Sequence, residues 1–207
     1  IPSLHTWCVL IALGARLRRV LRLPAGGALR WSIDLALGAW AGALVLLAAG
    51  LAGLTAWWWQ IGALAALGLV GSWRSPRPAA PLIASTLGGV IFLPVAVGTP
   101  FFYDAFVYHL GLPWQAMLEG GWRGHPENLF STFPPLAQLL YLPLLSVDLL
   151  RAPAMLHWLA WLTAASSVHA LARRSGAPPL AAGLAAAAAA AAPASVLVAG
   201  FPAAEAW

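Results

Sequence analysis

The sequence alternates long apolar stretches with short segments that carry most of the charged residues. A helix needs about 20 apolar residues to cross the hydrocarbon core of a bilayer. Ile1–Gly14 is apolar but too short to cross by itself, so we interpret it as the tail of a cut helix. Five other stretches meet or approach the required length and predict transmembrane helices: Trp31–Leu51, Trp57–Trp73, Ala79–Thr99, Ala154–Ala172 and Leu180–Ala199.

The composition narrows the class of protein. Hydrophobic residues make up 61% of the 207 residues and charged residues only 8%, whereas a soluble domain has about 25% charged residues. This balance excludes a water-soluble monomer and a disordered chain, and the single cysteine, Cys8, excludes a disulfide scaffold. We therefore predict an all-α fold, that of a polytopic transmembrane helical protein. The chain starts at Ile1 rather than Met, and we expect it to be an N-terminal fragment of something longer.

The arginines indicate which loops face the cytoplasm. All eleven basic residues are Arg, and nine of them flank predicted spans: Arg16, Arg18, Arg19, Arg22, Arg30, Arg74, Arg77, Arg173 and Arg174. Loops rich in Arg and Lys stay on the cytoplasmic side, so residues 100–153 form an outer loop in this topology. Arg30 also precedes Asp34 by four residues, a helical spacing that allows the two side chains to pair at the interface.

Pro134–Leu150 is the ambiguous part of this topology. The stretch is apolar but contains Pro143 and Asp148, and a crossing there would place Arg173 and Arg174 outside. We interpret it as a helix lying at the outer membrane surface. A full crossing stays open as the alternative, because short apolar runs do not distinguish the two.

The acidic residues gather on the side opposite the arginines. Five of the six fall outside in this topology: Asp104, Glu119, Glu127, Asp148 and Glu205. Asp104 directly follows the third predicted span and an aromatic segment typical of a membrane interface. At the start of a helix its ionised form is favoured by the helix dipole. From its position, Asp104 is either a functional acid at membrane depth or the N-cap of a surface helix, with Tyr108 on the same face and His109 beside it.

The rest of the polar loop offers candidate substrate-binding residues. Glu127 and Asn128 follow a turn rich in Gly and Pro. From its position alone, Glu127 is a solvated turn residue. Arg123 can bind a phosphate through bidentate hydrogen bonds, or it can form a salt bridge with Glu119 four residues earlier.

A divalent metal ion is a candidate cofactor for the same loop. Asp104, Glu127 and His125 could supply oxygen and nitrogen ligands, but no short spacing signature demands a metal. Without a metal, His109 and His125 are ordinary polar surface residues. The metal site and the plain polar surface therefore both stay open.

Two segments of the loop resemble a known family. YDAFVYHLGLP and then PENLFSTFPPLAQLLY are similar to the first periplasmic loop of polytopic glycosyltransferases of the GT-C fold, related to the protein O-mannosyltransferases (glycosyltransferase family 39) and to the aminoarabinose transferase of lipid A. The resemblance covers about residues 80–207. Family members often have Gly–x–x–x–x–Asp in a second outer loop, where this chain has Gly200 and Glu205. The resemblance divides the chain into N-terminal membrane helices, residues 1–78, and a GT-C-like catalytic membrane region, residues 79–207, incomplete at its C-terminus.

The resemblance implies transfer of a sugar from a polyprenyl-phosphate-linked donor to an acceptor at the extracytoplasmic face of the cytoplasmic membrane. The family's catalytic carboxylate, an acid early in the first outer loop, maps onto Asp104. Glu127, Arg123, His109, Tyr108, Asn128 and Glu205 are then the candidate substrate-binding residues. The implied partners are membrane lipid, the lipid-linked donor and an acceptor that is a lipid, a glycan or a protein.

Two other functions remain open. A transporter would place charged residues inside its spans along a path, and a non-catalytic membrane subunit would tolerate loss of every outer carboxylate. The chain contains no Gly-rich phosphate loop, no CxxC pair and no basic–aromatic module for nucleic acid. A nucleotide-sugar enzyme and a nucleic-acid partner are therefore disfavoured.

Overall fold

A computed structural model of the chain describes residues 2–24, 26, 29–54, 103–132, 135–145 and 151–192. All regular structure in these residues is helical, as the apolar pattern predicts. The four long helices are α1 (Pro2–Val20), α2 (Leu29–Leu51), α9 (Arg151–Arg174) and α10 (Pro179–Ala191). The short elements are η2 (Ala105–His109), α6 (Gly111–Glu119), η3 (Leu129–Thr132), α7 (Leu136–Leu139) and α8 (Leu142–Leu145).

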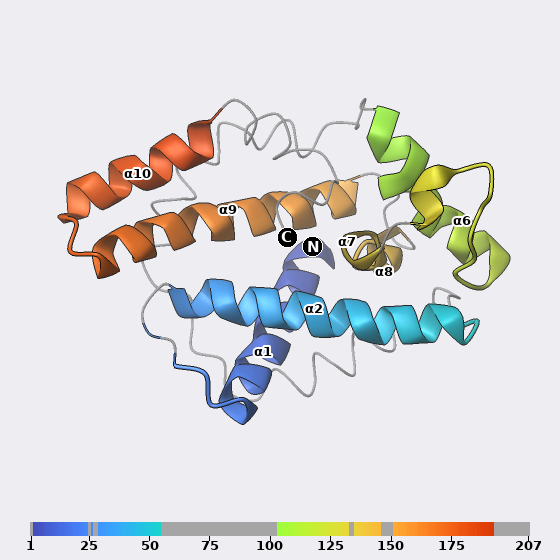
Figure 1. The fold of residues 1–207 in the computed structure, drawn as a ribbon, viewed down its shortest axis with the longest axis horizontal. Helices are drawn as coiled ribbons and strands as arrows, with labels where there is room; N and C mark the ends of the chain where they lie inside the picture. Colours follow the sequence, from blue (N-terminus) through green and yellow to red (C-terminus); the bar gives the residue numbers. More distant parts are fainter. Residues whose placement is uncertain are drawn as a thin grey trace.

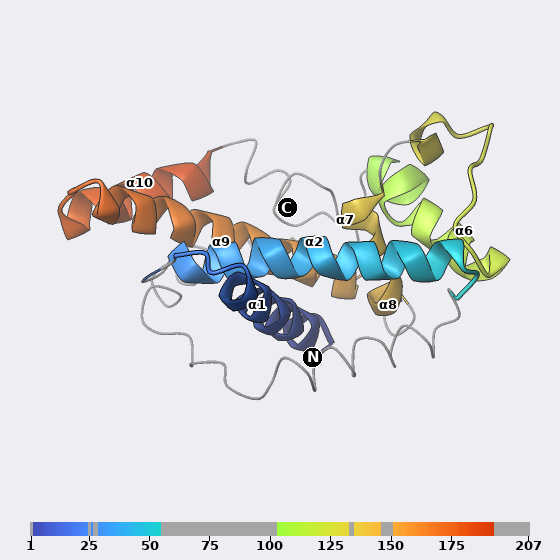
Figure 2. The same ribbon diagram turned by 60° about the horizontal axis from the view of Figure 1, so that its bottom comes forward.

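The long helices form a layered bundle. Helices α2 and α9 lie side by side and run in opposite directions, α1 crosses them, and α10 folds back along α9 (Figures 1 and 2). The short elements η2, α6 and η3 lie at the end of the bundle where α2 finishes (Figure 1). There the backbone N–H of Trp122 donates to the carbonyl of Gly50, a distance of 3.1 Å, which ties the loop to the last turn of α2.

Helices α1 and α2 cross with their backbones in contact. A Cβ added at Gly14 would lie 1.6 Å from the backbone oxygen of Asp34, and one at Gly38 would lie 1.7 Å from that of Leu10. Neither position has room for any side chain. Close helix approach through small residues is a common arrangement in membrane bundles, where it maximises van der Waals contact.

One face of α2 packs into the main hydrophobic core. Its buried residues recur every three or four positions, at Leu35, Ala39, Ala43 and Leu46, as expected for one stripe of a helix. They pack against apolar residues of α1, α7, α8 and α9. The opposite face of α2 is exposed, including its large residues Trp40, Leu44, Val45 and Leu51. An apolar helix with an exposed apolar face is suited to contact with lipid.

Among the described helices, only α2 is long and apolar enough to cross a membrane. Buried core helices and N-terminal signal sequences can share that length and composition, so α2 alone gives weak support for association with a membrane. The fourth predicted span lies within α9, and α10 covers the first part of the fifth. The second and third predicted spans, and the division at residues 78 and 79, lie outside the described residues.

The prediction of a single surface helix over Pro134–Leu150 is wrong for the part that the structure describes. Two one-turn helices, α7 and α8, occupy residues 136–145. The side chains of Leu139, Tyr141 and Leu142 are at most 1% exposed, so they lie in the protein core. Pro143 falls inside α8, and a proline lacks the N–H that a continuous helix requires. Apolar content here reflects burial among α2, α6 and α9.

The two ends of the bundle differ in charge. At one end, arginines lie in or after the last turns of α1 and α9 and before the apolar part of α2. At the other end, where α2 finishes and α9 begins, lies the loop that carries Asp104, Glu119 and Glu127. A 23-residue helix such as α2 is about 34 Å long. The described residues therefore separate the basic segments from the acidic loop by roughly the thickness of a bilayer core.

Candidate functional site

The candidate site begins with one turn of π-helix, η2, which is followed directly by α6. The N–H of Leu110 reaches back to the carbonyl of Ala105 at 2.8 Å, which closes this wide turn. A Cβ at Gly111 would lie 2.1 Å from the backbone oxygen of Phe106, so the passage from η2 into α6 requires glycine. Single π-turns are frequent at functional sites because they redirect the side chains beside them.

Asp104 lies exposed at the N-terminus of η2. Its backbone is helical, with φ −61° and ψ −35°, and its side chain makes no capping hydrogen bond. An N-cap residue has a non-helical backbone and accepts a hydrogen bond from the next turn. The N-cap alternative is therefore not what the geometry shows, and the carboxylate is presented at the surface of the loop.

Tyr108 and His109 are packed within the loop. The Tyr108 ring is stacked on Phe130 with centroids 4.2 Å apart, and it lies 4.1 Å from the His109 ring. His109 is only 5% exposed, and its Nδ1 lies 3.3 Å from the side-chain nitrogen of Gln138. Tyr108 thus connects η2 to η3, and His109 connects η2 to α7. Both residues therefore hold η2 in position next to Asp104.

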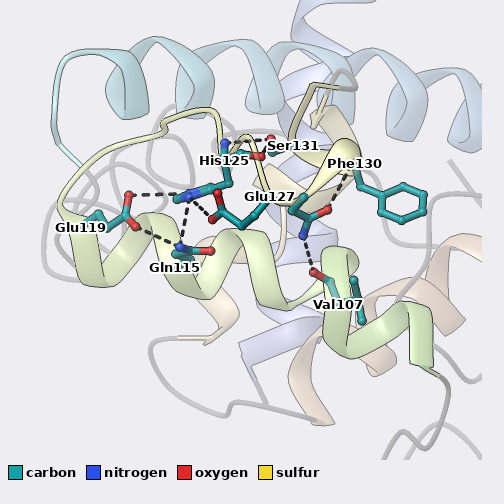
Figure 3. Close-up of polar contacts among 8 residues, drawn as sticks. Val107, Gln115, Glu119, His125, Glu127, Phe130 and Ser131 are labelled. Carbon is teal, nitrogen blue, oxygen red and sulfur yellow. Dashed lines mark hydrogen bonds and ion pairs between the residues drawn. The ribbon is translucent and has the colours of Figure 1, made fainter.

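His125 is the centre of a polar cluster (Figure 3). The side-chain nitrogen of Gln115 lies 3.1 Å from its Nδ1 and donates to Glu119 at 3.0 Å. A Glu127 carboxylate oxygen lies 3.4 Å from Nδ1, and a Glu119 oxygen lies 3.6 Å from Nε2. The imidazole thus has a carboxylate beside each of its nitrogens, and the contacts become ion pairs when it is protonated. Ser131 fixes the backbone of His125 through two hydrogen bonds of 2.9 Å.

Asn128 connects the two halves of the loop. Its side-chain nitrogen donates to the backbone oxygen of Val107 in η2 at 3.1 Å, and its oxygen accepts the N–H of Phe130 at 3.1 Å (Figure 3). Both polar atoms of its side chain are therefore used inside the protein. Asn128 therefore helps to hold η2, which begins directly after Asp104.

Arg123 is exposed beside this cluster. The expected alternative, a salt bridge to Glu119, is absent among the described residues, where Glu119 lies against His125 and Gln115. The Arg123 side chain is thus exposed at the loop surface without this salt bridge. Glu205, the remaining predicted substrate-binding residue, lies outside the described residues.

The described residues contain no group of three or more His, Cys, Asp or Glu side chains arranged to hold a metal ion. The geometry of the His125 cluster gives a reason. Glu119 and Glu127 lie beside opposite nitrogens of one ring, so a single ion cannot bind both carboxylates together with the imidazole. A site composed of Asp104, Glu127 and His125 stays a prediction that would need these side chains to move together.

Sequence reasoning missed several of these partners. Gln115 precedes Glu119 by four residues, a helical spacing that predicts their contact, but nothing in the sequence connects either one to His125. Gln138 and Ser131 had no recognisable signal, because their contacts depend on the tertiary positions of α7 and η3.

The expected pair between Arg30 and Asp34 is confirmed, with atoms 3.6 Å apart, and Arg18 joins it. The Arg18 guanidinium lies 2.5 Å from the Asp34 carboxylate, and both side chains are at least nine-tenths buried.

Polar contacts also join α9 to the first two helices. The indole N–H of Trp7 in α1 donates to the hydroxyl of Thr163 in α9 at 3.3 Å. Ser167 also donates to Ser32 across α9 and α2.

Comparison with known proteins assigns neither a family nor a function to the chain. No protein-family model matches the chain, and neither a curated protein nor a solved structure matches it. The resemblance to GT-C glycosyltransferases therefore depends on the loop residues alone.

Proposed function

We propose that the protein is part of a multi-pass membrane glycosyltransferase that moves a sugar from a polyprenyl-phosphate donor to an acceptor at the extracytoplasmic face of the cytoplasmic membrane. The observation that carries the proposal is the position of Asp104. It is an exposed carboxylate that makes no capping hydrogen bond, directly before η2, in the loop that packs on the end of α2 opposite the arginine-rich ends of α1 and α9.

This position suits the chemistry of a lipid-linked donor. The polyprenyl tail of such a donor stays in the bilayer, so its phosphate lies at headgroup depth, where a loop at the end of a spanning helix is found. The acceptor hydroxyl loses its proton as the new glycosidic bond forms, and a carboxylate can accept that proton. In this proposal Asp104 is the general base.

The leaving phosphate needs a positive partner as its bond to the sugar breaks. Arg123 is exposed in the same loop and can bind a phosphate through two parallel hydrogen bonds. Glu127, whose side chain is 70% exposed, is available to bind the sugar or a divalent metal ion. Tyr108, His109 and Asn128 contribute by holding η2 in place.

The decisive experiment compares two isosteric variants of the full-length protein in transfer assays with a polyprenyl-phosphate sugar. Asp104→Asn should reduce transfer at least about a hundredfold, since loss of a general base costs about two to four orders of magnitude. Glu119→Gln, which changes a carboxylate of the same loop that is engaged with His125, should retain most of the activity. Equal activity in Asp104→Asn and wild type would refute the role of Asp104 and favour a non-catalytic subunit.

The buried Asp34 favours a second candidate function. Ionisable residues inside spans often line the path of a substrate or ion, and Asp34 is 2% exposed within α2. A transporter would show uptake in proteoliposomes without glycosyl transfer, and its uptake would not change in Asp104→Asn. In the glycosyltransferase, by contrast, Asp104→Asn abolishes most of the activity.

A further inference from the structure

Three chain segments bring exposed arginines to one end of the bundle, which we call the arginine end. Its exposed arginines are Arg16, Arg19, Arg22, Arg173 and Arg174, from the end of α1, the turn after it and the end of α9. The segments are held together: Arg18 of α1 contacts Asp34 of α2, and Ser32 of α2 contacts Ser167 of α9. Both views show the ends of α1 and α9 on the side where α2 begins (Figures 1 and 2).

The charge of the arginine end is not balanced by acids of the described residues. Asp34 is the acidic residue of the described part nearest to it, and its carboxylate is already paired with Arg18 and Arg30. The other described acids, Asp104, Glu119 and Glu127, belong to the loop at the far end of α2. Among the described residues, the arginine end therefore carries an excess of positive charge.

Large apolar side chains lie among these arginines. Val20 is 72% exposed, Leu21 56% and Leu23 41%, in a segment that also contains Arg19 and Arg22. Arg22 has a left-handed backbone, with φ 54°, which ends the helical run and turns the chain. A surface that mixes exposed guanidinium groups with exposed aliphatic side chains matches the boundary between phosphate headgroups and acyl chains.

We propose that the arginine end binds anionic phospholipid headgroups of the cytoplasmic leaflet. Arg19, Arg22, Arg173 and Arg174 contact the phosphates, and Val20, Leu21 and Leu23 enter the acyl boundary. Basic segments directly beside a spanning helix are attracted to anionic lipids in this way, and arginine matches phosphate geometry particularly well. The inference requires α2 to lie in a bilayer, but it does not depend on sugar transfer.

Native mass spectrometry of the full-length protein tests the proposal. The protein in detergent is offered equal amounts of phosphatidylglycerol and phosphatidylcholine, and the retained molecules of each lipid are counted. Wild type should retain about tenfold more phosphatidylglycerol, and the preference should fall as salt is raised. A variant with Arg19→Gln, Arg22→Gln, Arg173→Gln and Arg174→Gln together should show almost no preference.

Arg151→Gln is the matched control, because Arg151 begins α9 and lies at its opposite end. This variant should keep the preference of wild type. A second variant, with Val20→Ser, Leu21→Ser and Leu23→Ser, preserves every arginine and should retain less of either lipid. The salt dependence of the wild-type protein tests the proposal even where a variant does not fold.

Three results would overturn the proposal. The first is equal retention of the two lipids by wild type at low salt. The second is an equal loss of preference in Arg151→Gln and in the fourfold variant. The third is displacement of phosphatidylglycerol by millimolar inorganic phosphate or by a single-stranded RNA, which would assign the surface to a soluble phosphate ligand or a nucleic acid. Transfer activity is unaffected by any of these outcomes, so the glycosyltransferase proposal is judged separately.

Discussion

The guanidinium of Arg18, near the end of α1, lies 2.5 Å from the carboxylate of Asp34 in the second turn of α2. Both residues are buried, and the pair joins two helices whose backbones touch at Gly14 and Gly38. Among the described residues, Asp34 is the one acidic partner of Arg18, and Asp34 has only Arg30 as a second basic partner. The ion pair therefore fixes the register at which α1 and α2 cross. The crossing thus combines a steric requirement with an electrostatic one.

Removal of one charge from this pair should be strongly destabilising. Asp34→Asn leaves the Arg18 guanidinium buried without its counter-charge, and breaking a buried pair in this way costs about 3–5 kcal/mol. Arg30→Gln should cost only about 0.5 kcal/mol, because Arg30 is one-third exposed and pairs with Asp34 at helical spacing. Thermal unfolding of the purified protein in detergent measures both. Equal midpoints for Asp34→Asn and Arg30→Gln would contradict the buried pair.

The glycine crossing gives a second prediction. Gly38→Ala places a Cβ where the backbone oxygen of Leu10 lies, so the helices must separate, at a cost of about 3 kcal/mol or more. Gly183→Ala in α10 is the matched control, since no heavy atom lies within 4 Å of the added Cβ. Alanine is favoured over glycine in a helix by about 0.5–1 kcal/mol, so this variant should be slightly stabilised. Denaturation midpoints in the same detergent distinguish the two changes, and similar midpoints would argue against close contact.

Part of this architecture could be predicted from the sequence. The continuous apolar run predicts α2, whose observed start at Leu29 differs by two residues from the expected Trp31. The pair of Arg30 and Asp34 follows from helical spacing. Arg18 could not be assigned to Asp34, because the two residues are on different helices and only the packing of Gly14 against α2 brings them together.

Two features could not be derived from the local pattern, because packing decides them. The apolar stretch Ile1–Gly14 continues as helix to Val20, since arginine is a good helix former and Arg18 is buried against Asp34. Residues 136–145 are apolar because they are buried, a property that composition alone does not distinguish from contact with lipid. In the candidate site, the exposure of Asp104 could not be derived either, because it depends on the π-turn after it.

The role of Asn128 as a connector gives a third prediction. Asn128→Asp preserves the oxygen that accepts from Phe130 but replaces the donor to Val107 with an acceptor. The loss of this part-buried bond should cost about 1–2 kcal/mol and loosen η2 locally. Hydrogen exchange of the amides of residues 105–111 should accelerate in the variant, while that of α10 should not change. Unchanged exchange in η2 would show that Asn128 does not hold it.

The opposite sidedness of the two ends gives the last prediction, which the single native cysteine makes practical. In a Cys8→Ser background, Leu118→Cys introduces a thiol in the loop and Ser175→Cys introduces one at the arginine end, directly after Arg174. Both positions are exposed, so neither thiol is protected by burial. In right-side-out membrane vesicles, a membrane-impermeant maleimide should label the Leu118→Cys protein and spare the Ser175→Cys protein, and permeabilisation should expose both. Labelling of Ser175→Cys alone from outside would invert the topology and place Asp104 on the cytoplasmic face, away from a donor whose sugar lies outside.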